Sequence, residues 1–329
     1  MIDHKRGING AKRTLMNEII KKNRRFYDEH VAPMIHEQFP EYESRIAVGI
    51  AGEGSDCFGY DDEISRDHDF GTGVCLWLTD EDMAKIGEEL SKAYDELVAD
   101  KERSFYTDRL SERRGVMTVH DFYSNILRID CDTKNCRMTE EQWQKLDHSC
   151  LATAVNGEVF RDDIGQFTQF RSILFGYYPD RIWRIRIAEK MHEYSAVLQV
   201  NYQRCMTRGD IVAAEACRIK AMNAAMELYF LINRRYMPFY KWSYRALKEL
   251  DKSGAFAARI DELARLHADE GAWEGTKYHP NRPNLKDRVV GLAEDIGYDI
   301  SEMLKEKGLI ERINPYLEAD VDKILGEER

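Results

Sequence analysis

The spacing of apolar residues predicts long amphipathic helices, most of them in the second half of the chain. Apolar side chains recur every three or four residues over 187–205 and again over 213–231, which is the repeat of one helix face. Gly209-Asp210 separates the two stretches and supplies a C-cap and an N-cap. We therefore expect an antiparallel helix pair, the start of a helical bundle. Further amphipathic helices are expected near residues 8–38, 80–98, 254–268, 284–307 and 316–327.

Short apolar runs predict strands in the first half of the chain. Residues 46–50, 74–78 and 115–119 are too short for helices and long enough for buried strands. A further extended segment is expected over 152–160, with a hairpin turn at Asn156-Gly157. The order of these elements predicts that strands lie early in the chain and that helices dominate later.

The length and composition favour two domains with a real core. The chain has 329 residues, so one large or two ordinary domains are expected. We divide it into an α+β domain over residues 1–150 and a mainly helical domain over residues 151–329. Hydrophobic residues make up 43%, enough for a core, and charged residues make up 33%, which indicates long solvated helices.

The charge and the cysteines limit the partners and the compartment. The net charge is −11 and the pI is about 5.4, which argues against nonspecific binding to nucleic acid or to anionic membranes. No apolar run approaches a membrane helix, and the N-terminal residues lack the apolar region of a signal peptide. The seven cysteines are scattered and lack zinc-site spacing, so we expect reduced thiols in a cytoplasmic protein.

The candidate chemistry follows the first expected strand. Gly52, Gly54 and Ser55 come directly after it. Glycine allows the backbone to approach a phosphate closely, and the N–H groups of a loop can surround phosphate oxygens. The simpler interpretation is an ordinary turn.

An acidic pair follows the glycine loop. Alternate residues of a strand share a face, so Asp67 and Asp69 are expected to point to one side. Two neighbouring carboxylates repel unless a cation lies between them, and oxygen ligands suit Mg²⁺ bound together with phosphates. A solvated acidic loop is the alternative. We favour the metal site because the pair leads into the apolar run 74–78, where an unpaired charge would be costly.

The spacing of these motifs resembles a known signature. Gly54-Ser55, eleven intervening residues and Asp67-His68-Asp69 resemble the motif of DNA polymerase β-like nucleotidyltransferases, which include kanamycin nucleotidyltransferase-type proteins. The chain is still more similar to domain-of-unknown-function family 4037, described as nucleotidyltransferase-like. This likeness covers roughly residues 40–250 and rests on further motifs: Gly157-Glu158-Val159-Phe160 with Asp162, Tyr177-Tyr178-Pro179, Gly209-Asp210, and residues 235–242 (RYMPFYKW).

The resemblance implies a fold and an activity. It implies that residues 1–150 form a polymerase β-like domain with a small mixed sheet, which transfers a nucleoside monophosphate from an NTP to a hydroxyl of an unknown acceptor. In that case Asp67 and Asp69 bind Mg²⁺ (or Mn²⁺), and Gly54 and Ser55 bind the β and γ phosphates.

A basic and aromatic cluster in the second half completes the resemblance. Lys241, Tyr240 and Arg245 are then nucleotide-binding residues, with Lys241 neutralising the departing pyrophosphate. The alternative is that Lys241 and Arg245 lie on a surface while Tyr240 and Trp242 pack.

The sequence departs from the nucleotidyltransferase pattern at the third carboxylate. The expected place holds Met117 and Thr118, so the general base is Asp121 or Asp130, or the third acid is missing.

Two other functions therefore stay open, as do the acceptor and the oligomeric state. One is a catalytically inactive nucleotide-binding module. The other is a metal-dependent phosphohydrolase that uses Asp67, His68, His120 and Asp121.

Overall fold

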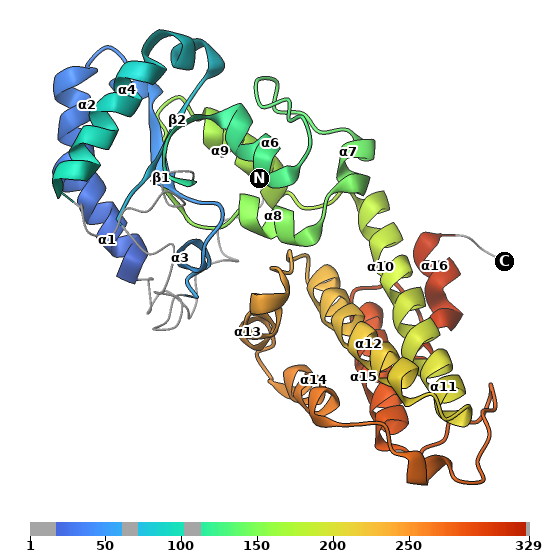
Figure 1. The fold of residues 1–329 in the computed structure, drawn as a ribbon. Helices are drawn as coiled ribbons and strands as arrows, with labels where there is room; N and C mark the ends of the chain where they lie inside the picture. Colours follow the sequence, from blue (N-terminus) through green and yellow to red (C-terminus); the bar gives the residue numbers. More distant parts are fainter. Residues whose placement is uncertain (1–17, 61–71, 102–112, 327–329) are drawn as a thin grey trace. The chain divides into compact units, whose positions relative to one another are not determined.

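A computed structural model describes residues 18–60, 72–101 and 113–326 of the chain. It contains two compact units, Met1–Gly176 and Tyr177–Arg329 (Figure 1). The first unit ends at Gly176, past the predicted domain boundary at residue 150, and it includes a strand that lies beyond that boundary. No helix in the described ranges is both long and apolar enough to cross a membrane.

The first unit is built on a four-stranded mixed sheet. Its strands lie in the order β3-β2-β1-β4. Strand β1 pairs antiparallel with both β2 and β4, whereas β3 runs parallel to β2. The bounds are Ala47–Ile50 for β1, Cys75–Leu78 for β2, Gly115–Thr118 for β3 and Glu158–Arg161 for β4. The expectation of an α+β chain with a small mixed sheet is thus confirmed.

The expected extended segment over 152–160 is wrong in its first part. Residues up to Ala154 end helix α8 (His148–Ala154), which begins where the Asp147 side chain accepts a hydrogen bond from the Ser149 N–H. The chain then turns and enters β4. Gly157 has a φ of 72°, and a Cβ there would overlap the carbonyl oxygen of Ile50. Glycine at this position therefore allows β4 to approach β1.

Helices cover both faces of the sheet. Helices α1 (Glu18–Phe26), α2 (Ala32–Gln38) and α4 (Asp80–Lys101) lie on one face (Figure 1), where their buried side chains form one core with Val48, Leu76 and Leu78. On the other face Trp77 stacks on Phe167, with ring centroids 3.8 Å apart. The helices of this unit are α1 (Glu18–Phe26), η2 (Tyr27–Val31), α2 (Ala32–Gln38), α3 (Ser55–Phe58), α4 (Asp80–Lys101), α6 (Val119–Leu127), α7 (Glu140–Lys145), α8 and α9 (Gln166–Phe175).

The second unit consists of helices, and the expected helix pair is confirmed. Gly209 has a φ of 70°, and the Asp210 side chain accepts a hydrogen bond from the Ala213 N–H at 3.0 Å. The helices of this unit are α10 (Asp180–Tyr194), η5 (Ser195–Tyr202), α11 (Gln203–Thr207), α12 (Ile211–Ile232), α13 (Tyr240–Leu250), α14 (Ala255–Arg265), η6 (Glu270–Trp273), α15 (Arg288–Glu306), η7 (Leu317–Asp320) and α16 (Val321–Leu325).

Candidate functional site

One end of the sheet gathers the connections that carry the candidate chemistry. Gly49, near the end of β1, pairs with Cys75 at the start of β2, and Cys75 pairs with Gly115 at the start of β3. Ile50 pairs with Glu158, the first residue of β4. Strand β1 therefore ends where the other three strands begin. We call this the loop end of the sheet.

The glycine loop, residues 51–55, lies at the loop end between β1 and α3 and includes Ser55, the first residue of α3. Gly52 and Gly54 have φ angles of 102° and 121°, a backbone region that residues with a side chain rarely adopt. A Cβ on Gly54 would also overlap Oδ1 of Asp56. The backbone of this loop thus has a shape that these two glycines make possible.

Several amides of the glycine loop are uncommitted. The Gly52 N–H donates to Oδ1 of Asn156 at 2.8 Å, and the Gly52 carbonyl accepts from Nδ2 of the same residue at 2.7 Å. By contrast, no acceptor from the described part of the chain pairs with the N–H groups of Glu53, Gly54 or Ser55. These are donors that an anion can use.

Arg114 supports the loop from the side of β3. Its guanidinium is buried; Nη2 donates to Oδ2 of Asp56 at 2.9 Å, and Nη1 lies 3.4 Å from the carbonyl oxygen of Ala51. The thiols of Cys57 and Cys75 lie in the same interior, where burial raises the pKa of each and keeps them protonated. The loop is therefore held by a buried ion pair.

A second arginine lies at the rim. Nη1 of Arg113 is 3.5 Å from the point that a Cβ on Gly54 would occupy. No sequence pattern indicated either arginine, because a basic pair before a strand is typical of an exposed surface. Only the position of β3 beside β2 reveals that they face the glycine loop.

The acidic pair cannot be located in this structure. Asp67, His68 and Asp69 lie outside the described residues, in the chain between α3 and β2. Within the described ranges no group of three or more His, Cys, Asp or Glu side chains is arranged to hold a metal ion. The paired-carboxylate site stays a prediction.

The two candidate bases lie together elsewhere. Nε2 of His120 is 2.9 Å from Oδ1 of Asp130, and its Nδ1 is 3.6 Å from Oδ1 of Asp121. The hydrogen bond to Asp130 raises the pKa of His120. Asp121 is the third residue after Thr118, which ends β3, so this group lies at the end of the sheet opposite the loop end.

The expected place of the third acid has a structural role. Thr118 ends β3 and is the N-cap of α6, where its Oγ1 accepts a hydrogen bond from the Asp121 N–H at 2.8 Å. A threonine there starts the helix. Neither Met117 nor Thr118 can supply a carboxylate.

The three candidate nucleotide-binding residues of the second unit lie on α13. Tyr240 is 85% exposed, so the alternative in which Tyr240 and Trp242 both pack is wrong for Tyr240 and right for Trp242. Trp242 is buried, and Nζ of Lys241 and Cζ of Arg245 lie 5.7 and 5.8 Å from the centroid of its indole ring. Two cations thus share one aromatic ring on this helix. Their role toward a nucleotide stays a prediction.

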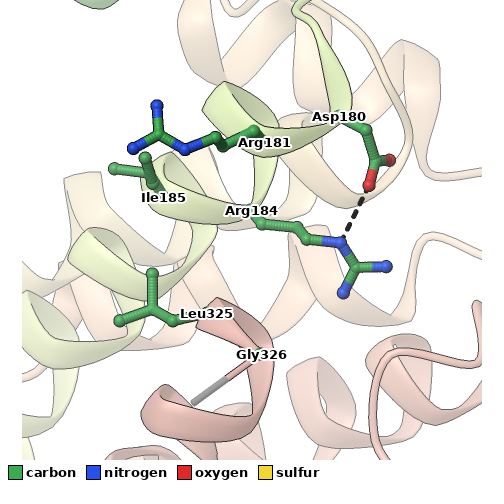
Figure 2. Close-up of a pocket in the computed structure, with 6 residues that line it drawn as sticks. All are labelled: Asp180, Arg181, Arg184, Ile185, Leu325 and Gly326. Carbon is green, nitrogen blue, oxygen red and sulfur yellow. Dashed lines mark hydrogen bonds and ion pairs between the residues drawn. The ribbon is translucent and has the colours of Figure 1, made fainter.

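A pocket of about 460 Å³ lies in the second unit between the start of α10 and the end of α16 (Figure 2). It is lined by Asp180, Arg181, Arg184, Ile185, Leu325 and Gly326. Asp180 accepts from Nε of Arg184 at 2.9 Å, and it pairs with Nη2 of Arg234 at the same distance. These two ion pairs neutralise the carboxylate of Asp180 in the wall of the pocket. No residue expected to bind nucleotide lines this pocket.

Comparison with known proteins gives one match. A family model described as "Domain of unknown function (DUF4037)" matches residues 143–243, from α7 to the start of α13. No curated protein and no solved structure matches the chain. The matched stretch contains Asn156-Gly157, β4 and α9, but the glycine loop and the acidic pair precede it. The similarity to this family is therefore supported over residues 143–243, and the family's description assigns no activity.

Proposed function

We propose that this protein is a Mg²⁺-dependent nucleotidyltransferase of the polymerase β-like type. The observation that carries the proposal is the glycine loop after β1. Its amides at Gly54 and Ser55 are uncommitted, and it lies at the end of the sheet where β2 begins. The sequence spacing from this loop to Asp67 and Asp69 supplies the second argument.

In this proposal the loop binds the phosphates of an NTP. The N–H groups of Gly54 and Ser55 donate to phosphate oxygens, and the guanidinium beside Gly54, that of Arg113, adds positive charge. Lys241, Tyr240 and Arg245 of the second unit contribute further contacts to the nucleotide. Lys241 neutralises the pyrophosphate that leaves.

Asp67 and Asp69 hold the cation in this proposal. Paired carboxylates suit Mg²⁺, or Mn²⁺ in its place, and a bound ion stabilises charge on the attacking and leaving oxygens. The acceptor hydroxyl oxygen forms a bond to the α-phosphorus of the NTP. The bond from that phosphorus to the bridging oxygen breaks, pyrophosphate leaves, and the hydroxyl proton passes to a base or to water.

The second candidate is an inactive nucleotide-binding module of the same fold. The position of Asp121 and Asp130 favours it, because both pair with His120 at the end of the sheet opposite the loop end. The same position gives no support to a phosphohydrolase. That activity needs His120 and Asp121 beside Asp67 and His68.

The experiment combines binding with turnover. Mg²⁺-dependent affinity for a nonhydrolysable ATP analogue is measured by calorimetry, and pyrophosphate release is measured with aminoglycosides, sugars, tRNA and a protein as acceptors. Asp67→Asn with Asp69→Asn is expected to abolish the Mg²⁺ dependence, with Asp80→Asn at the start of α4 as the control. Binding with pyrophosphate release supports the transferase, and binding without release supports the module. No binding to the wild type contradicts both.

A further inference from the structure

Arg171 is a buried cation on α9 that no described carboxylate neutralises. Its residue is 8% exposed, and its Nη2 donates to the backbone carbonyls of Val155 at 2.8 Å, of Asn156, and of Gly157 at 3.3 Å. Its Nε has no acceptor in the described structure, and burial lowers the pKa of the guanidinium. Burying a charge without a counter-charge is costly, so this arginine needs an explanation beyond packing.

The turn that Arg171 holds contacts the glycine loop on both sides. Asn156 in this turn pairs through its side-chain amide with the N–H and the carbonyl of Gly52. The N–H of Gly157 donates to the carbonyl of Cys57 in α3 at 2.9 Å. The uncommitted amides lie between Gly52 and Cys57. The turn therefore fixes the chain immediately before and after them.

We propose that Asn156 and Arg171 are positioning residues that hold the glycine loop in shape to bind the phosphates of a nucleotide. Arg171 fixes the turn, Asn156 fixes Gly52, and the amides up to Ser55 are then oriented before the ligand arrives. The identity of the ligand rests on the proposed nucleotidyltransferase function. A loop that is already ordered loses less entropy on binding, which increases affinity.

Among the described residues no carboxylate compensates the charge of Arg171, which supports a role in anion binding. This charge adds positive potential to the loop end of the sheet, and a bound triphosphate would supply a counter-charge that no described carboxylate provides. Arg218 of the second unit provides the contrast. It is also buried and donates to a backbone carbonyl, that of Leu263, but Glu215 neutralises it at 2.6 Å. Arg218 is thus the matched control for removal of a buried arginine.

The first measurement needs no ligand. Hydrogen exchange of the Gly52 and Gly157 amides, which donate to Asn156 Oδ1 and to the Cys57 carbonyl, is compared by NMR in the wild type, Asn156→Ala, Arg171→Gln and Arg218→Gln. We expect exchange to be about tenfold faster in the first two variants, because each loses hydrogen bonds that hold the turn and the loop together. Amides of β2 should exchange at the same rate in all four proteins. Arg218→Gln should leave exchange at the loop unchanged.

The second measurement is affinity for Mg²⁺–ATP. We expect a dissociation constant about tenfold higher in Asn156→Ala and in Arg171→Gln, with Arg171→Lys between Arg171→Gln and the wild type because it keeps the charge. Arg218→Gln should lower the melting temperature and leave the affinity unchanged. If Arg171→Gln does not fold, Arg171→Lys and Asn156→Ala decide the result.

The outcomes separate this proposal from the proposed function. Unchanged hydrogen exchange at the loop in both Asn156→Ala and Arg171→Gln would overturn the positioning role. The same holds if nucleotide affinity falls only in proportion to the loss of stability, and by the same factor in Arg218→Gln as in Arg171→Gln. A wild type that binds no nucleotide contradicts the proposed function alone. Faster loop exchange in the two variants would still support the positioning of the loop.

Discussion

The two ends of the sheet in the first unit differ in how their polar groups are satisfied. At the loop end, Gly54 and Ser55 present amides without an acceptor among the described residues. At the opposite end, His120 pairs with Asp121 and Asp130, and Thr118 caps a helix. Polar groups that already satisfy one another have less to offer a ligand than groups that do not. The comparison favours the loop end as the binding site.

The largest effect is expected at the buried ion pair behind the loop. Arg114→Met removes the buried guanidinium that pairs with Oδ2 of Asp56 and leaves that buried carboxylate without its cation, so it should lower the free energy of unfolding by about 3–5 kcal/mol. Urea denaturation measures this. Removal of an exposed partner, Lys85→Met at its 2.5 Å pair with Glu81, should leave the free energy of unfolding nearly unchanged, because solvent screens that pair. Equal losses in the two variants would show that the loop end does not depend on Arg114.

The approach of β4 to β1 gives the next effect. Gly157→Ala puts a Cβ against the Ile50 carbonyl at a φ of 72°, and we expect a loss of about 2–4 kcal/mol from strain and displacement. Gly209→Ala is the matched control: its φ is 70°, and a Cβ there meets nothing within 4 Å. That change should cost only about 1–2 kcal/mol. If both variants unfold at the same urea concentration, the close strand approach is not the cause.

A smaller effect separates binding from stability. A side chain at Gly54 would displace Asp56 and approach Arg113, so Gly54→Ala should weaken binding of Mg²⁺–ATP by about tenfold or more, which corresponds to about 1.4 kcal/mol. Gly254→Ala, with a φ of 72° and open space around it, is the control. Normal affinity in a folded Gly54→Ala protein would reduce the glycine loop to an ordinary turn.

The smallest effect concerns the opposite end. The hydrogen bond to Asp130 raises the pKa of His120, so the folded state binds this proton more tightly. Its contribution is fully present below the unfolded pKa of about 6.5 and is lost as the pH rises through the folded pKa. For an exposed pair we expect less than about 1 kcal/mol.

Urea denaturation at pH 5.5 and at pH 8.5, compared between the wild type and Asp130→Asn, measures the contribution of His120. The variant should lose this part of the pH dependence. Nucleotide affinity should not change, because the pair lies away from the glycine loop. A loss of nucleotide affinity in Asp130→Asn would indicate that this end of the sheet is part of the candidate site.

Local signals predicted much of the secondary structure. The repeat of apolar residues predicted α10 to α12, and Gly209-Asp210 predicted the break between them. The amphipathic pattern near residues 80–98 predicted α4, which begins where Thr79 Oγ1 accepts from the Asp82 N–H at 3.0 Å. The apolar runs predicted β1, β2 and β3. These features depend on residues within one turn or one strand of each other, so the sequence carries them directly.

The sequence by itself also determined where glycine recurs in the loop, and hence where a backbone could approach a phosphate. Only the tertiary structure decided what surrounds that loop. Asn156 reaches Gly52 across 104 residues, and Arg114 reaches Asp56 across 58. The parallel pairing of β3 with β2 sends Asp121 to the opposite end of the sheet. The direction of strand pairing and the partners of a buried arginine depend on contacts between distant segments, and no local pattern encodes them.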